Sequence, residues 1–121
     1  MVVSSQPEQL RERTKAFALR VIRLYRSLPY KTDTQVLGKQ LLRCGTSVAA
    51  NYRAVCRSRS KAEFIARMGI VVEEADETIL LLELMTESGI VSSTKTEALL
   101  KEANELTAIF AASQRTARNA A

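Results

Sequence analysis

A basic segment between residues 43 and 67 holds the side chains of this sequence that are best suited to binding a charged ligand. Its members are Arg43, Arg53, Arg57, Arg59, Lys61 and Arg67. Glu63 is the only acidic residue in that interval. Arginine carries a planar fork of donors that matches the oxygens of a phosphate. The segment therefore predicts contact with a polyanion, and Arg20 and Arg23 are candidates for the same contact.

Charge is divided unevenly along the chain. Residues 1–67 carry 14 Lys and Arg against 4 Asp and Glu, a balance of +10, whereas residues 68–121 carry 4 against 9. Such an asymmetry attracts nucleic acid, or it lets the acidic face of one protomer meet the basic face of another. Plain solvated helix faces are the third interpretation.

Aromatic side chains that could stack on bases are scarce near the basic segment. Tyr52 and Phe64 are the only two within it, and Phe64 is needed by the core. Stacking on aromatic side chains is a main source of affinity for single strands. Any contact with nucleic acid is therefore expected to be mainly to phosphates, salt-sensitive and weakly selective for sequence.

Enzymatic and metal chemistry has little support in this sequence. The chain has no histidine, which removes the commonest general base and the commonest neutral metal ligand. The acidic run at 73–77 lacks the Glu-x-x-His pairs of di-metal bundles. Cys44 and Cys56 lie twelve positions apart on one expected helix, about 18 Å, and cannot form a disulfide. We predict a protein that is not an enzyme, with no catalytic residue, metal ligand or cofactor.

The elements that position these residues are expected to be helices. Four Gly, two Pro and an apolar content of 46% favour aliphatic helix packing over a turn-rich sheet. Apolar periodicity and stop signals predict four helices, at about 5–28, 33–57, 60–88 and 94–116. The connections are short, so the expected fold is all-α: an up-down-up-down antiparallel four-helix bundle that forms a single domain over residues 1–121.

Three helices begin with a capping signal. Ser5, Ser60 and Thr94 each precede an acidic residue by three positions, the spacing of a capping box. Ser5 should therefore start the first helix, Ser60 the third and Thr94 the fourth.

The second helix has a polar residue on its predicted apolar stripe. The stripe runs through Leu37, Leu41, Cys44, Val48, Asn51 and Val55. Burying an amide without partners costs on the order of 1–3 kcal/mol. Asn51 is therefore predicted to be a structural polar residue whose hydrogen bonds set helix register or association state. The alternative is a rotation of the helix by one position, which would turn Tyr52 inward.

Two surfaces are assigned to self-association. The third helix is apolar nearly all round from 79 to 85, so residues off its main stripe, Ile70, Leu81 and Leu84, are predicted to form a subunit interface. The alternative is that they are apolar residues scattered on the surface. In the second helix, Gly45 and Ala49 belong to a run of small residues that lets another helix approach closely. Whether that helix is in the same chain or in another subunit is left open by the sequence.

The expected location is the reduced cytoplasm, without a membrane partner. No apolar run approaches the roughly 20 residues of a membrane span. The first residues show neither the basic nor the apolar region of a signal peptide.

Several motifs resemble those of a known family. They are Leu28 and Pro29, Leu41 to Arg43, Thr46 to Tyr52, Phe64 to Arg67, and Glu73 to Thr78. In order and spacing, over roughly residues 10–112, they are similar to the four-helix-bundle family encoded in intervening sequences of 23S ribosomal RNA. After Asn51 this sequence departs from the commoner family pattern, which continues with small apolar residues and Glu-Gly. Here Tyr52 and Arg53 follow, which adds positive charge.

The resemblance implies a small bacterial bundle that assembles as a homopentamer, with no enzymatic activity established for the family. A related branch, the accessory proteins of diversity-generating retroelements, implies a basic pentamer that binds nucleic acid and a reverse transcriptase. Two functions are therefore expected. One is a homo-oligomer that binds RNA or DNA backbone through the turn between the second and third helices. The other is a protein-interaction scaffold or accessory subunit, for example of a reverse transcriptase, with no direct role in nucleic-acid binding.

Overall fold

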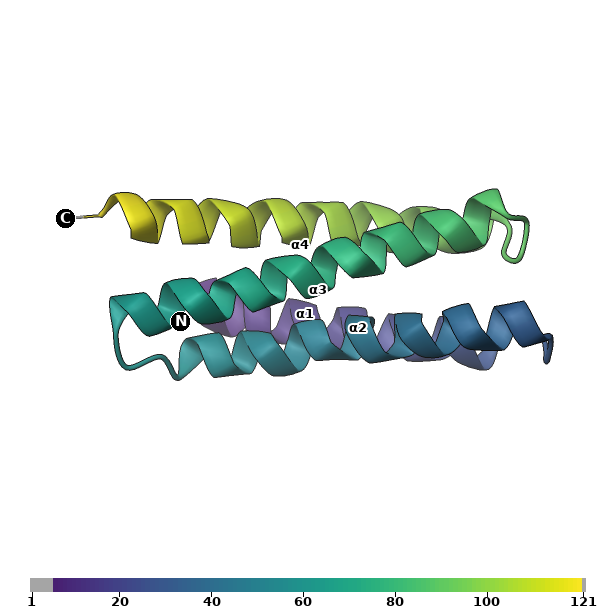
Figure 1. Ribbon diagram of the computed structural model, residues 1–121, viewed down its shortest axis with the longest axis horizontal. Coiled ribbons are helices and arrows are strands. Elements are labelled where there is room, and N and C mark those ends of the chain that lie inside the picture. The colour runs from purple at the N-terminus through teal and green to yellow at the C-terminus, as the bar shows by residue number, and fades with distance from the viewer. Residues whose placement is uncertain (1–5, 121) are drawn as a thin grey trace, which may run out of the picture.

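Four α-helices make up the computed structural model, which describes residues 6–120. They are α1 (Gln6–Arg26), α2 (Thr32–Cys56), α3 (Lys61–Glu87) and α4 (Ser93–Asn119). Each helix runs antiparallel to the next along the chain, so that the start of α1 and the end of α4 lie at the same end of the bundle as the α2–α3 connection (Figure 1). No strand occurs within the described residues, and the all-α prediction is confirmed.

The start of α3 follows the predicted capping chemistry, whereas that of α4 does not. Ser60 has an extended backbone and its side chain accepts a hydrogen bond from the Glu63 backbone N–H. In α4 the N-cap is Ser92, without a side-chain cap, and Thr94 already lies inside the first turn. Thr94 Oγ1 and Ser92 Oγ instead share a hydrogen bond of 3.0 Å, so the prediction for Thr94 was wrong. Ser5 lies outside the described residues.

The helices end where the sequence supplies a stop. α1 ends at Arg26, three residues before Pro29, which cannot donate to a continuing helix. After α3, Gly89 adopts φ = 82°, a left-handed conformation that glycine takes without the steric cost of a Cβ atom. Both helix ends keep the connections between antiparallel neighbours short.

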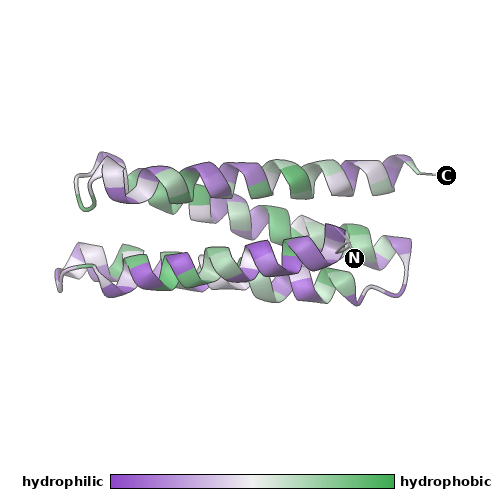
Figure 2. Ribbon diagram, turned by 180° about the vertical axis from the view of Figure 1, so that it is seen from behind, coloured by the Kyte–Doolittle hydropathy of each residue, from purple (hydrophilic) through white to green (hydrophobic). Residues whose placement is uncertain are grey.

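The core is mainly aliphatic, with a few aromatic rings, and lies along the inward stripes of all four helices. Figure 2 shows hydrophobic and hydrophilic residues alternating along each helix, as amphipathic packing requires. The largest fully buried side chains are Phe17, Phe110, Leu41, Met68, Leu82, Met85 and Leu106. Cys44 is fully buried among them, as expected for a small core residue.

The stripe of α2 contains Tyr52 rather than Asn51. Tyr52 is 4% exposed and its ring stacks on Phe110 with centroids 5.5 Å apart. Asn51 is half-buried, and its Nδ2 donates to Ser47 O at 2.9 Å and to Ser47 Oγ at 2.7 Å. Burying the ring removes a large apolar area from water and leaves no amide to satisfy in the core. The alternative of a one-position rotation is therefore correct, and the prediction that Asn51 lies on the core stripe was wrong.

α1 and α2 approach closely because α2 presents glycines to α1. A Cβ atom built on Gly45 would lie 2.8 Å from both Cγ atoms of Val21, and one on Gly38 would lie 2.8 Å from Leu28 Cδ1. The close-packing partner of Gly45 is thus α1 of the same chain. Its assignment to a subunit interface is corrected accordingly.

The α1–α4 seam is the most loosely packed contact between neighbouring helices. It is bridged near the start of α1 by Arg13, whose Nη2 lies 2.6 Å from Glu102 Oε1 and 3.3 Å from Glu105 Oε2. Beyond this bridge, toward the C-terminal end of α1, the seam opens into a pocket, described below.

Candidate nucleic-acid interface

A groove between α1 and α2 has a floor of small residues and a basic rim. Its volume is about 450 Å³, and it is lined by Lys15, Ala18, Leu19, Thr46, Ala49, Ala50, Arg53, Ala54 and Arg57. The close approach of the two helices brings Lys15 of α1 to the same opening as Arg53 and Arg57 of α2. Ala49 lines this groove, half-buried, instead of packing tightly against another helix.

The groove continues into a second depression between the first half of α1 and the end of α2. This depression, about 290 Å³, is lined by Arg11, Glu12, Arg53, Cys56 and Arg57. Because Arg53 and Arg57 line both, the two form one continuous surface. We call it the basic groove and define it by its cations, Arg11, Lys15, Arg53 and Arg57.

The cations of the basic groove are not neutralised by neighbouring carboxylates. Within residues 6–120 none of the four forms an ion pair, and Glu12 is the one acidic residue that lines the surface. Four positive charges therefore face solvent from two helices. This arrangement can hold an extended anion through charge-assisted hydrogen bonds.

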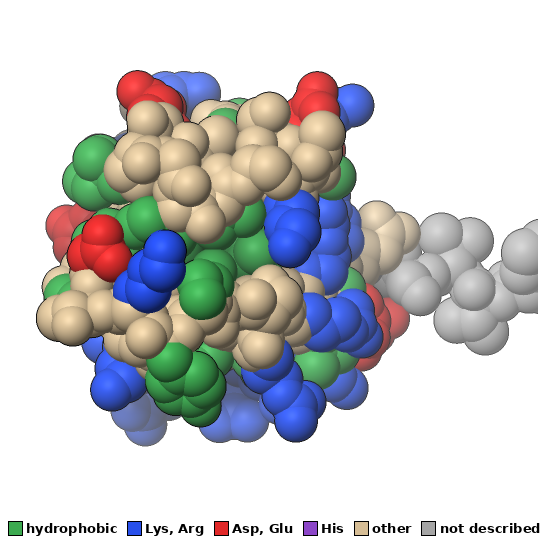
Figure 3. All heavy atoms as spheres, turned by 90° about the vertical axis from the view of Figure 1, so that its right-hand side faces the viewer, with side chains coloured by type: hydrophobic (Ala, Val, Ile, Leu, Met, Phe, Trp, Pro, Cys, Tyr) green, Lys and Arg blue, Asp and Glu red, His purple; other side chains and the backbone are tan. Residues whose placement is uncertain are grey.

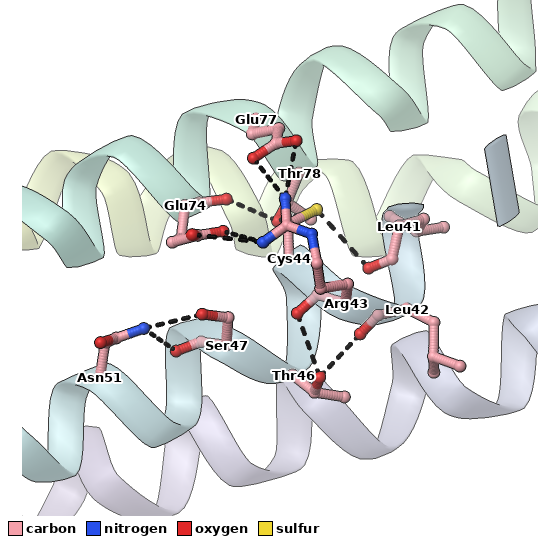
Figure 4. A network of polar contacts seen from close by, with 10 residues as sticks. All are labelled: Leu41, Leu42, Arg43, Cys44, Thr46, Ser47, Asn51, Glu74, Glu77 and Thr78. Carbon is pink, nitrogen blue, oxygen red and sulfur yellow. Dashed lines mark hydrogen bonds and ion pairs between the residues drawn. The ribbon is translucent and has the colours of Figure 1, made fainter. Parts of the chain in front are cut away.

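Arg43 is held away from this surface by α3. Its Nη2 lies 2.8 Å from Glu77 Oε2 and its Nη1 3.3 Å from Glu74 Oε2 (Figure 4). The hydrogen bond to Glu77, followed by the charge of Glu74, raises the pKa of Arg43 above its ordinary value. Its charge is therefore already matched within the chain, and Arg43 is a poor candidate for binding nucleic acid.

Arg67 also has an internal role. Its Nη2 lies 2.8 Å from Glu63 Oε1, and its Nη1 donates to the Ala54 carbonyl oxygen at 2.8 Å. Ala54 is in the last turn of α2, and its carbonyl oxygen also accepts a hydrogen bond from the Arg57 backbone N–H at 3.1 Å. Arg67 thus joins α3 to the end of α2, and it does not line the basic groove.

The remaining predicted cations are divided between two places. Arg59 and Lys61 lie exposed at the α2–α3 connection, where Lys61 Nζ donates to the Ala120 carbonyl oxygen. Arg20 and Arg23 lie on the other flank of α1, in a pocket shared with Lys95. Of the eight cations predicted from the sequence, only Arg53 and Arg57 line the basic groove. Their partners Arg11 and Lys15 were not predicted, although their spacing of four residues on α1 is typical of one helix face.

Comparison with known proteins identifies the family. A model described as "23S rRNA-intervening sequence protein" matches residues 8–112. The chain belongs to this family. The resemblance inferred from its sequence motifs is thereby confirmed.

A solved structure from Bacteroides thetaiotaomicron VPI-5482 is similar to this family member. It is described as a protein with unknown function from the S23 ribosomal protein family. It is 28% identical, with a TM-score of 0.84, and the match covers 92% of this chain and 99% of that chain. No curated protein matches the chain.

Three large aliphatic side chains are exposed on one side of α3 in this family member, with Glu73 and Glu77 between the first of them and the other two. Ile70, Leu80 and Leu84 are 46%, 53% and 45% exposed, and we call them the α3 outer face. Leu81 is only 4% exposed, because it lies three residues after Thr78 and four before Met85, both of which are buried. Its assignment to a subunit interface was wrong, and Leu80, which was not predicted, takes its place on the α3 outer face.

Other potential chemistry is limited. Burial raises the pKa of the Cys44 thiol, which lies 3.2 Å from Thr78 Oγ1 in a hydrogen bond. In the part of the chain that the structure describes, no three Cys, Asp or Glu residues are grouped so as to hold a metal ion. Among the same residues, no helix combines the length and apolar character that crossing a membrane requires.

Proposed function

We propose that this chain is a non-enzymatic, homo-oligomeric four-helix bundle that binds the phosphate backbone of RNA or DNA. The binding surface is the basic groove. The observation that carries this proposal is the convergence of four cations from α1 and α2 on one groove, without an ion pair within residues 6–120. Membership of a family named after an intervening sequence of 23S rRNA supports it.

The chemistry of the groove favours backbone contact over base recognition. Among the described residues that line it, no aromatic side chain could stack on a base. Each phosphate neutralised by Lys or Arg releases counterions, and the affinity for a duplex then falls with a slope of about −0.9 per phosphate in log–log form. Four cations therefore predict a slope of about −3 to −4 for each protomer, with little dependence on sequence.

Fluorescence anisotropy across a KCl series tests this function. Labelled RNA and DNA duplexes should bind at low salt with the slope given above. The double variant Arg53→Gln, Arg57→Gln should lower the magnitude of the slope by about 2, because two phosphate contacts are lost.

The matched control is the double variant Arg26→Gln, Lys39→Gln. It removes the same charge from exposed positions of α1 and α2 that do not line the groove. We expect it to keep the slope of the unaltered protein. Absence of binding at low salt, or an equal loss in the control, would refute the proposal.

Self-association is proposed to use the α3 outer face. Three large aliphatic side chains exposed on one helix of a small domain form an unusual surface for a monomer, because covering them would remove apolar area from water. By family resemblance the oligomer is a pentamer. A ring would repeat the basic groove in every subunit and make nucleic-acid binding multivalent.

A scaffold or accessory-subunit function is the second candidate, and the same surface favours it. If the α3 outer face binds another protein, for example a reverse transcriptase, that partner should stay bound in a pull-down after nuclease treatment. A partner that is lost on nuclease treatment would show that nucleic acid had bridged the two proteins.

A further inference from the structure

A second pocket lies on the other flank of α1, between the C-terminal half of α1 and the start of α4. Its volume is about 340 Å³, and it is lined by Arg20, Arg23, Leu24, Ser27, Lys95, Ala98 and Leu99. Leu24 and Leu99 are buried core residues that reach its floor, whereas Arg23 and Lys95 are exposed at its rim. We call it the seam pocket.

The charges around the seam pocket have one sign. Arg20 and Arg23 come from α1 and Lys95 from α4, and no acidic residue is among the described residues that line it. None of the three forms an ion pair within residues 6–120. Seen from the end that carries the α1–α2 and α3–α4 connections, Lys and Arg side chains gather on the α1 side next to hydrophobic ones (Figure 3).

About two turns nearer the start of α1, the same seam has charges of both signs. There Arg13 of α1 meets Glu102 and Glu105 of α4, so that cation and carboxylates neutralise one another. At the seam pocket both helices instead supply cations to one concave surface. Like charges repel, and an anion bound between them relieves that repulsion.

We propose that the seam pocket binds an organic phosphate monoester with an aliphatic body. A phosphate monoester carries a charge of about −1.5 to −2 near neutral pH, which suits three cations better than a carboxylate does. Arg20 and Arg23 supply the donor forks that match phosphate oxygens. Leu24, Leu99 and Ala98 supply an apolar surface for the body of the ligand.

The seam pocket differs from the basic groove in the feature that selects such a ligand. The one leucine that lines the groove, Leu19, is exposed and lies among Ala and Thr, whereas the pocket is lined by two buried core leucines, Leu24 and Leu99. Both volumes lie within the usual range for small-ligand sites. The pocket and the groove share no cation, so the inference does not rest on the proposed nucleic-acid binding.

Isothermal titration calorimetry with four soluble probes tests the inference. Octyl phosphate should bind one site per chain. Inorganic phosphate lacks the aliphatic body, octanol lacks the charge, and octanoate carries one charge; each should bind at least about tenfold more weakly. Equal affinity for octyl phosphate and inorganic phosphate would reduce the site to a non-specific anion site and overturn the proposal, as would equal affinity for octyl phosphate and octanol.

A sedimentation experiment with vesicles distinguishes a free ligand from a lipid headgroup. Sedimentation with phosphatidylcholine vesicles, with and without phosphatidic acid, is compared with the binding of octyl phosphate in solution. Binding to phosphatidic acid together with octyl phosphate assigns the site to a lipid, and binding to octyl phosphate alone assigns it to a soluble phosphoester. Binding to neither overturns the proposal.

Variants locate the site. Arg20→Gln and Lys95→Gln should each weaken octyl phosphate binding by about five- to tenfold, whereas Lys101→Gln on α4 and Arg53→Gln in the basic groove should leave it unchanged. If Arg20→Gln fails to fold, Ala98→Glu places a negative charge at an exposed pocket position and should abolish binding. Equal weakening by Lys101→Gln or Arg53→Gln would show general charge attraction and refute the assignment.

Discussion

Gly45→Ala is a sharp test of how α1 packs on α2. The added Cβ atom would lie 2.8 Å from Val21 Cγ1, 2.8 Å from Val21 Cγ2 and 3.2 Å from Val21 Cβ. Val21 is fully buried, and both of its methyl groups are in the way, so a change of rotamer cannot clear the contact. The backbones of α1 and α2 would have to separate.

The expected size of the effect follows from two opposing contributions. Overpacking a tight core contact costs about 1–3 kcal/mol. Replacing glycine by alanine inside a helix stabilises it by about 1 kcal/mol. The net result should be a loss of about 1 kcal/mol, which in a domain of this size lowers the Tm by about 3–5 °C.

Gly69→Ala is the matched control. The nearest atom to its added Cβ is Gln114 Nε2 at 3.1 Å, the far end of a flexible side chain. We expect Gly69→Ala to leave the free energy of unfolding unchanged or to raise it by up to about 1 kcal/mol. The two glycines are both helical, so the difference between them compares the contact with Val21 to that with Gln114, whose Nε2 donates to the Ile65 carbonyl oxygen at 3.0 Å.

Urea denaturation followed by circular dichroism measures these effects in a double-mutant cycle. In a Val21→Ala background the obstructing methyl groups are gone, and Gly45→Ala should then stabilise the protein. Light scattering should give the same mass for Gly45→Ala as for the unaltered chain. If Gly45→Ala stabilises the unaltered protein as much as Gly69→Ala does, α1 does not cover Gly45 and the packing described here is wrong.

Three further predictions concern the surface, the thiols and the response to pH. Leu80→Glu combined with Leu84→Glu should give a soluble monomer by light scattering, while Val36→Glu, at an exposed position of α2, should keep the oligomer; a monomeric unaltered protein would contradict this. A thiol reagent should modify Cys56 quickly and Cys44 only on unfolding, because Cys44 is fully buried and burial raises its pKa; rapid modification of both would contradict the packing. Burial, with a smaller effect from Cys56, raises the pKa of Tyr52 above its ordinary value of 10.0, and that of Cys44 is raised above 9.0. The folded state therefore favours the protonated forms of both groups, and their contribution to the free energy of unfolding should be full below about pH 9 and fall as the pH rises further. Tyr52→Phe should make that fall shallower in urea titrations, and equal slopes for the two proteins would contradict the assignment.

Features that depend on a single helix were largely predictable from the sequence. The hydroxyl of Ser60 and the amide of Glu63 are three residues apart, so their capping bond needs no information about the rest of the fold. Asn51 and Tyr52 show the limit of this reasoning. Both fit a stripe with spacings of three and four residues, and the choice between them depends on Phe110 in α4, which stacks on Tyr52.

Features that depend on two helices were not predictable in this way. Arg43 belongs to the basic segment in the sequence, but the register of α2 against α3 places it beside Glu74 and Glu77, more than thirty residues away. Lys15 and Arg53 are 38 positions apart and line one groove because α1 and α2 are in contact. A pattern within one helix carries no information about such a pairing. Charge density along the sequence therefore predicted a binding role for Arg43, which is paired within the chain, and did not predict one for Lys15.

The dependence of the basic groove on helix packing connects the fold to the proposed function. Ala49 and Gly45 lie on α2 about one and two helical turns before Arg53. Their small size sets how near Lys15 of α1 comes to the arginines of α2. If one anion is held from both sides, Gly45→Ala should weaken duplex binding even though it removes no charge, and adding Val21→Ala should restore it. Cations that act independently would give the same affinity in all three proteins. The salt slope should stay constant throughout, because the number of neutralised phosphates does not change.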